Sequence, residues 1–503
     1  PVLLSMKTGK PVKMIASREE SFTLSGFRLP TVVYLKTGVM KDGTMVAREA
    51  TSIFDTGAYT GPGVQSGISH SMGAYNIPNA KLRSCGVYTN KIGAGSYRAS
   101  GVADVVFAVE SHTDIIAHKL GMDPMEFRLK NLIQEGDISI RGDKIPHNGL
   151  KETLQVVRER LGVLGNPEEG HGVGISVGEW RSGSGPSSAN VTVNEDGTLT
   201  VLTGSVDISG SDTSLAQIAA ETLGVDVDQV VMPKRDTDMA PFTGASGGSR
   251  IVYSQGKAVQ LASQDARDKL LALAAERLGT NMDALKCAGG RVYVEDNPEQ
   301  GHTLANLARM SFTSPTGPIM GTASLSTLGF APVFNTQAAQ IRVDTETGQI
   351  RVTRFIQGQD VGTAINTMSV EGQMEGGAIQ AVGRAVTENV VFDQGKVMNP
   401  SLTTYLMPLA PDMPPLENIL VQVPSDEGPF GARAVAEPPG FGAPAAIANA
   451  IYNAVGVRIK DLPLTDEKIM AALRGEAPEE ENLDLSFLEG SSDGGPIQWT
   501  GSG

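Results

Sequence analysis

Residues 339–352, Ala339-Gln-Ile-Arg-Val-Asp-Thr-Glu-Thr-Gly-Gln-Ile-Arg-Val352, place two runs of alternating apolar and polar residues on either side of a Thr-Gly turn. Such alternation around a glycine turn is typical of a β-hairpin. The hairpin runs on to Gln359-Asp-Val-Gly362, and a segment of helical period, residues 370–382, follows it. We expect this order of strand, turn, strand and Asp/Gly turn to organise the fold.

Two more copies of this unit precede it. Residues 39–47 run on to the turn at 54–58, and residues 189–202 run on to the turn at 206–210, with a helix-period segment at 213–223. Hairpins are common, so a chance recurrence is the alternative. Three copies with the same ending favour related α+β lobes. Further helices are predicted at 101–120, 125–133 behind a capping box at Asp123, 258–278, 443–456 and 462–473.

The bulk composition limits the possible functions. The 503 residues are 40% hydrophobic and 19% charged, which suits two or more globular domains. A net charge of −15 argues against a nucleic-acid or anionic-membrane surface. No apolar run is long enough to predict a membrane span. The 59 glycines indicate many tight turns or places where backbone approaches a ligand closely.

Cysteine and histidine spacing predicts no metal site made of side chains. Cys85 and Cys287 are too few for an iron–sulfur cluster, which takes about four ligands. The pair His112 and His118 does not share a helical face. We expect a reducing compartment, the cytoplasm. The first residues have no methionine or signal peptide and suggest a helix followed by a strand, so we expect an internal cut of a longer polypeptide or a split subunit.

One carboxylate stands out among small residues. Residues 428–439, Gly-Pro-Phe-Gly-Ala-Arg-Ala-Val-Ala-Glu-Pro-Pro, set Glu437 in front of two prolines that stiffen the backbone. A carboxylate held in this way can be a general base. The alternative is a surface glutamate that opens the helix at 443–456, where acids favour the helix dipole.

Four segments rich in glycine and serine lie in predicted loops: 93–101, 182–188, 207–213 and 243–250. The first presents Arg98, which suits oxyanions or, alternatively, pairs with a surface carboxylate. Together the segments indicate backbone wrapped around an extended, phosphate-bearing ligand. None matches a Walker A loop or a Rossmann fingerprint.

Five ordered motifs resemble the molybdenum-binding subunit of the xanthine dehydrogenase/aldehyde oxidase family. They are residues 97–101 (Tyr-Arg-Ala-Ser-Gly), 122–133 (Met-Asp-Pro-Met-Glu-Phe-Arg-Leu-Lys-Asn-Leu-Ile), 360–366 (Asp-Val-Gly-Thr-Ala-Ile-Asn), 371–377 (Glu-Gly-Gln-Met-Glu-Gly-Gly) and 434–439 (Ala-Val-Ala-Glu-Pro-Pro). The resemblance runs from residue 1 to about 475 and implies an α+β fold of repeated mixed sheets with flanking helices. It implies a first molybdenum-cofactor-binding domain over 1–165 and a second over 166–475. An acidic docking or disordered tail over 476–503 follows.

The resemblance also implies the cofactors and the partners. The family binds molybdenum with molybdopterin cytosine dinucleotide in bacteria, and no protein side chain ligates the metal. A [2Fe–2S] subunit and an FAD subunit would receive the electrons. Another polypeptide would carry the family's first molybdenum-domain segment, with its Phe-Gly-Gly loop. The implied reaction hydroxylates an sp² carbon of a small organic substrate with oxygen from water.

By this resemblance, Glu437 is the general base and Arg98 lies beside the metal. The implied cofactor contacts are Arg98, Ser209, Gly210, Ser211, Asp212, Thr213, Gly248, Ser249, Gln373 and Ala434. The sequence departs from the family at Ala436, where glycine is usual, and at Ser209-Gly210-Ser211, where Gly-Gln-Gly is usual. The second change puts a glutamine contact in doubt.

The substrate residues also depart from the purine-oxidising members. Ser100 replaces the stacking aromatic and Ser66 aligns near the purine-binding arginine, which argues against xanthine. Trp180 lies near the position of a second aromatic, so we expect a flat neutral ring or an aldehyde. The alternatives are an aldehyde or carbon-monoxide dehydrogenase of the same family, and a non-catalytic scaffold subunit.

Overall fold

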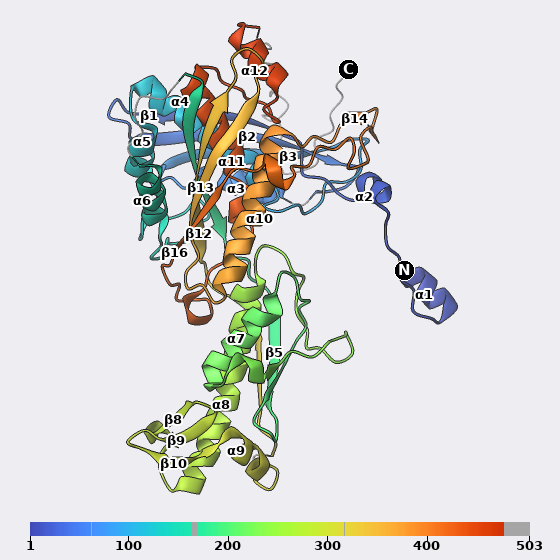
Figure 1. Cartoon of the computed structure of the whole chain (residues 1–503), viewed down its shortest axis with the longest axis vertical. Coiled ribbons are helices and arrows are strands. Elements are labelled where there is room, and N and C mark those ends of the chain that lie inside the picture. The colour runs from blue at the N-terminus through green and yellow to red at the C-terminus, as the bar shows by residue number, and fades with distance from the viewer. Residues whose placement is uncertain (62, 163–168, 316, 477–503) are drawn as a thin grey trace.

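The computed structural model describes residues 1–61, 63–162, 169–315 and 317–476, and it confirms the three predicted hairpins (Figure 1). Each pairs antiparallel around its glycine turn, as the alternating sequence requires. The paired strands are β1 (Thr31–Val39) with β2 (Met45–Gly57), β5 (Ser187–Val193) with β6 (Leu199–Thr203), and β12 (Pro332–Val343) with β13 (Ile350–Asp360).

A helix and a parallel strand follow each of these three hairpins, so the repeat is longer than the sequence indicated. In each copy the new strand lies parallel to the second hairpin strand. The added elements are α3 (Val64–His70) with β3 (Asn79–Tyr88), α7 (Ser211–Leu223) with β7 (Val230–Val231), and α10 (Thr367–Val386) with β16 (Leu416–Val421). The pattern missed α3 because it has only seven residues, with Gly and Ser among them. The predicted α+β class is confirmed.

The middle of the chain forms a separate lobe, drawn in green and yellow at the bottom of Figure 1. Its sheet has the order β11-β5-β6-β7, and α8 packs across it. The approach is close, because a Cβ at Gly321 would lie 1.9 Å from the Ala262 carbonyl oxygen. The remaining elements of the lobe are α8 (Gly256–Leu278), α9 (Leu304–Ser311), β8 (Leu285–Ala288), β9 (Arg291–Val294), β10 (Asn297–Thr303) and β11 (Met320–Leu325).

The larger body is built on the sheet β16-β13-β12-β4, where β4 spans His171–Arg181. Helix α11 (Ala443–Val455) lies on β4, and its small side chains let the helix approach the strand. A Cβ at Gly174 would lie only 2.1 Å from the Ala446 carbonyl oxygen, so glycine is required there. The other elements are α4 (Val102–Leu120), α5 (Pro124–Asn131), α6 (Leu150–Leu161), α12 (Asp466–Leu473), β14 (Phe392–Asp393) and β15 (Lys396–Val397).

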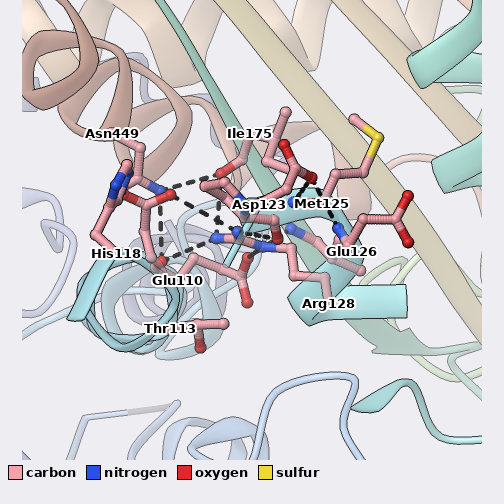
Figure 2. A network of polar contacts seen from close by, with 12 residues as sticks. Glu110, Thr113, His118, Asp123, Met125, Glu126, Arg128, Ile175 and Asn449 are labelled. Atoms are coloured by element: carbon pink, nitrogen blue, oxygen red, sulfur yellow. Dashed lines mark hydrogen bonds and ion pairs between the residues drawn. The ribbon is translucent and has the colours of Figure 1, made fainter. Parts of the chain in front are cut away.

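A buried charge pair joins α4 and α5 to this sheet (Figure 2). Glu110 and Arg128 have fully buried side chains, and Arg128 Nε donates to Glu110 Oε2 at 2.9 Å. The same carboxylate accepts the Val177 backbone N–H at 2.9 Å and the Tyr75 hydroxyl at 2.6 Å. Asn449 of α11 donates to the Ile175 carbonyl oxygen at 3.0 Å. The network therefore connects α4 and α5 with β4 and α11.

Several local predictions need correction. After α1 (Val2–Thr8) comes α2 (Arg18–Leu24) and not a strand, since Pro11 lacks an N–H and no described strand pairs there. Asp123 caps α5 through Met125 and Glu126, but the Glu126 side chain reaches Arg158 and so completes no capping box. Residues 187–188 and 211–213 belong to β5 and α7 rather than to loops, because strand pairing and the helix begin there.

Two expectations fall largely outside the described residues. The domain boundary at 165 lies within 163–168, and the acidic tail beyond Glu476 lies in 477–503, so both stay predictions. Among the helices of the described residues, none combines the length and apolar character that a bilayer crossing requires.

Candidate active site

The loop after β16 holds Glu437 at the centre of the candidate site. Glu437 comes just before a short 3₁₀ turn, Pro438–Gly440, and α11 begins at Ala443. The carboxylate Oε2 accepts the backbone N–H of Ala99, and the Glu437 N–H donates to Ser249 Oγ at 2.9 Å. Glu437 is half-buried and its carboxylate is hydrogen-bonded within the protein, which favours a site residue over a surface glutamate. Its carboxylate contacts a loop that lies far away in the sequence.

Arg98 joins that distant loop to the Glu437 loop. Its Nε donates to the Ala436 carbonyl oxygen, and its Nη2 donates to the Gln373 carbonyl oxygen at 2.7 Å. Nη1 donates to Gln380 Oε1 at 3.3 Å. Burial lowers the pKa of Arg98, and the carboxylate of Glu437 opposes that shift. Arg98 is therefore a half-buried link between three segments, and its described polar contacts are carbonyl and amide oxygens rather than a surface carboxylate.

Two glycines of helix α10, Gly376 and Gly377, lie next to the Arg98 guanidinium and let Gln373 of the same helix contact it. A Cβ at Gly377 would lie 3.0 Å from Arg98 Nη2 and 2.5 Å from the Pro439 side chain. At Gly376 it would lie 3.8 Å from Arg98 Nη1. The absence of side chains at Gly376 and Gly377 thus leaves room for the Arg98 guanidinium next to the helix.

The Gly248–Ser249 turn closes another side of the site. Gly248 accepts the N–H of Gly183 at 3.0 Å and the indole Nε1–H of Trp180 at 3.3 Å. Next to it, Ser182 Oγ accepts the N–H of Ala434 at 3.1 Å. Residues 251–255 form a π-helix before α8, an irregularity that is frequent at functional sites. The loops at 182–188 and 243–250 therefore meet the Glu437 loop.

One non-glycine residue in each of the segments 93–101, 207–213 and 243–250 has the left-handed backbone conformation that favours glycine. Ala99 has φ 57°, Ser209 has φ 56° and Ser249 has φ 62°. Each such conformation costs a non-glycine residue roughly 1–3 kcal/mol and is typical of functional sites. All three belong to segments in which the sequence predicted cofactor contacts.

Two of the predicted substrate residues, Trp180 and Ser66, contact a histidine. The ring of His70 stacks on Trp180 with centroids 6.1 Å apart, and His70 Nδ1 is 2.6 Å from the Ser66 carbonyl oxygen. Trp180 packs on the cluster that contains Ala99. A Cβ at Gly63, in the turn before α3, would lie 2.8 Å from Ser100 Oγ. Burial lowers the pKa of His70 to about 4, so its imidazole is neutral at pH 7.

The segment 209–213 lies at one end of the site. Gly210 precedes α7, and a Cβ there would lie 3.6 Å from Ser369 Oγ in the first turn of α10. Ser369 is one helical turn from Gln373. Asp212 pairs with Arg235, so its charge is compensated within the protein. The structure brings this segment to α10, whereas its described polar contacts do not include Glu437.

The described residues offer open backbone and no cluster of three or more metal-ligating side chains. In residues 1–61, 63–162, 169–315 and 317–476, no group of three or more His, Cys, Asp or Glu side chains could hold a metal. A Cβ at Gly247 would meet nothing within 4 Å, and one at Gly248 would meet only Gly183, at 3.6 Å. Such surroundings fit a large cofactor that brings its metal ligands and contacts backbone.

Two comparisons identify the family. Residues 1–132 and 155–414 each match the family described as the molybdopterin cofactor-binding domain. A putative xanthine dehydrogenase molybdenum-binding subunit from Escherichia coli (strain K12) is 33% identical over 494 residues. The chain belongs to the molybdopterin-binding xanthine dehydrogenase/aldehyde oxidase family. The match covers 93% of the chain and 65% of the Escherichia coli subunit, just under two thirds of that relative.

Other members of the family align over a similar share of the chain. The aldehyde oxidoreductase of Megalodesulfovibrio gigas is 31% identical and covers 93% of this chain, which spans 52% of that relative. The crystal structure of quinoline 2-oxidoreductase from Pseudomonas putida 86 superposes with a TM-score of 0.89 at 28% identity. That match covers 95% of this chain and 66% of the other. The fold and the order of its elements are therefore those of the family.

Sequence reasoning missed four residues that shape the site. Gln380 and His70 have no recognisable local signal. Ser182 and Arg250 lie in the predicted loops 182–188 and 243–250, but residue spacing does not predict which groups they bond. Arg250 Nη2 donates to the Gly185 carbonyl oxygen at 2.8 Å and holds two of the loops together.

Proposed function

We propose that this chain is the catalytic part of a molybdenum hydroxylase, which hydroxylates an sp² carbon with oxygen derived from water. The observation that carries the proposal is the contact of Glu437 with the Arg98 loop. Two segments far apart in the sequence hold one carboxylate and one guanidinium side by side. A non-catalytic scaffold would not need this arrangement.

The chain's own residues supply base chemistry and orientation. The N–H of Ala99 and the hydroxyl of Ser249 fix Glu437, whose carboxylate accepts the proton that the attacking oxygen gives up. Arg98 holds the Ala436 carbonyl oxygen and places a positive charge beside the carboxylate. When bound, the molybdenum cofactor supplies the centre that takes up the two electrons of the oxidation.

The cofactor in this proposal is molybdopterin cytosine dinucleotide. Open backbone at Gly248, the Gln373 side chain and the segment 209–213 would hold it, together with Ser249 and Ala434. The molybdopterin family of both matched domains supports the pterin. Partner subunits with [2Fe–2S] and FAD would receive the electrons in a cytoplasmic complex.

The proposed substrate is a neutral aromatic heterocycle or an aldehyde. Trp180 and the neutral His70 offer flat apolar surface, and small serines stand at 66 and 100. Quinoline 2-oxidoreductase and aldehyde oxidoreductase are among the similar proteins. Carbon monoxide oxidation is the second candidate, because a carbon monoxide dehydrogenase large chain from Hydrogenophaga pseudoflava is 28% identical over 529 residues.

The test measures molybdenum content and turnover of the purified complex with quinoline, benzaldehyde and carbon monoxide. Glu437→Gln should keep the molybdenum and lose at least about 10²-fold in kcat, the range for a positioned general base. Glu346→Gln, an exposed acid in the hairpin turn of β12 and β13, is the matched control and should keep full turnover. A wild-type complex without molybdenum would overturn the enzyme. Full turnover by E437Q would overturn the assignment of the base.

A further inference from the structure

Four buried amide side chains lie behind the loop of the candidate base. They face one another across β12 and β13, and they are between 0% and 1% exposed. The strand register places Asn335 opposite Gln359 and Gln337 opposite Gln357. Asn335 Nδ2 donates to Gln359 Oε1 at 3.0 Å, and Gln337 Nε2 donates to Gln357 Oε1 at 3.1 Å. Strand pairing thus fixes both amide pairs.

Two of these amides hold the loop on either side of Glu437. Gln359 Nε2 donates to the Val435 carbonyl oxygen at 3.0 Å, and Gln337 Nε2 donates to the Pro439 carbonyl oxygen at 2.9 Å. The residues bonded in this way lie two positions before and two positions after Glu437. Both edges of β13 already pair with β12 and β16, so this loop cannot join β13 as a strand, and its carbonyl groups take side-chain donors.

The third amide holds the helix on the other side of the site. Gln357 Nε2 donates to the Met374 carbonyl oxygen of α10 at 2.9 Å and to Asn418 Oδ1 at 2.8 Å. The preceding carbonyl group, that of Gln373, is the one that accepts from Arg98. One set of buried amides therefore contacts both the loop of the base and the helix of the predicted cofactor contact.

We propose that Asn335, Gln337, Gln357 and Gln359 are positioning residues, which set the carboxylate of Glu437 relative to α10. The expected effect on kcat rests on the proposed function. The placement of the Glu437 loop by these side chains rests on the hydrogen bonds alone. Apolar side chains in these places would leave buried carbonyl groups without donors, and the loop would shift to find others. A misplacement of about 1 Å in a catalytic group can cost about 10² in rate.

The test replaces the two loop donors in the purified complex, as Gln337→Met and Gln359→Met, which keep side-chain length and remove the N–H groups. With quinoline or benzaldehyde as substrate, kcat should fall about 10²-fold while KM and molybdenum content stay near wild type. Hydrogen–deuterium exchange of the peptide 430–442 should rise at least about 10-fold, in the same preparation and without substrate. Q359M carries the test alone if Q337M does not fold.

Thr336→Val is the matched control. Thr336 lies on the same strand between the two amides, faces the other side of the sheet, and shares a buried hydrogen bond of 2.9 Å with Thr153. It should lower the melting temperature, and leave kcat and the exchange of 430–442 unchanged. Wild-type exchange of 430–442 in Q337M and Q359M, or an equal loss of kcat in T336V, would overturn the positioning role. If the wild-type complex holds no molybdenum and oxidises neither these probes nor carbon monoxide, the proposed function is wrong, and the exchange contrast still decides the structural part.

Discussion

Removal of Arg128 should destabilise the larger body strongly, because it leaves a buried carboxylate without its cation. Arg128 and Glu110 are both fully buried, and Asp114 is 3.8 Å from the same guanidinium. Arg128 also donates to the Pro124 carbonyl oxygen at 3.0 Å. Breaking a buried ion pair in this way costs about 3–5 kcal/mol. We therefore expect Arg128→Met to lose that much of the free energy of unfolding.

The loss converts into a melting temperature. One kcal/mol shifts Tm by about 2–4 °C in a domain of 150–250 residues, so R128M should melt about 6–20 °C below wild type. The control is Arg158→Met, which removes an exposed ion pair with Glu126, whose side chains are 53% and 51% exposed. Exposed pairs contribute about 0–1 kcal/mol, so R158M should melt within about 4 °C of wild type. Scanning calorimetry at one scan rate measures both.

A double variant separates the buried charge from the lost packing. In E110Q/R128M a neutral amide replaces the carboxylate. Its oxygen can still accept the Val177 N–H, and its NH2 group can donate to the Tyr75 hydroxyl, which bonds the other carboxylate oxygen in Glu110. This variant should melt above R128M. The reasoning is refuted if R128M melts no lower than R158M, or if E110Q/R128M melts no higher than R128M.

Two further predictions concern stability. Burial raises the pKa of Glu179 to about 7, from 4.5 in the unfolded chain. The stability that this carboxyl group contributes is therefore fully present below pH 4.5 and is lost as pH rises through 7. Between pH ~5 and ~7.5 the Tm of wild type should fall more steeply than the Tm of Glu179→Gln, and an equal or smaller fall would contradict this. Gly174→Ala would place a Cβ 2.1 Å from one α11 backbone atom and 2.3 Å from another, so it should lower the free energy of urea unfolding by about 3 kcal/mol or more. Gly372→Ala lies at an exposed helical site with nothing within 4 Å, so it should raise this free energy by about 0.5–1 kcal/mol. Similar midpoints for these two glycine variants would refute the packing argument.

Much of the secondary structure was predictable because its signals are local. Alternation with period two on both sides of a glycine turn, as around Gly348, specifies a hairpin from about a dozen residues. Helical period and caps specify α4, α8 and α11 within a few residues of their ends. Helix α3 was missed because seven residues rich in Gly and Ser carry no such period.

The sequence by itself determined the hairpins, most helices and Glu437 as a candidate base, since each depends on neighbours along the chain. Only the tertiary structure decided which residues meet there. Arg98 reaches Ala436 across 338 positions and Gln373 across 275. The buried amides of β12 and β13 hold the loop that carries Glu437. No local pattern encodes such contacts, because they arise where separate strands, helices and loops pack together and leave carbonyl groups that must find a donor.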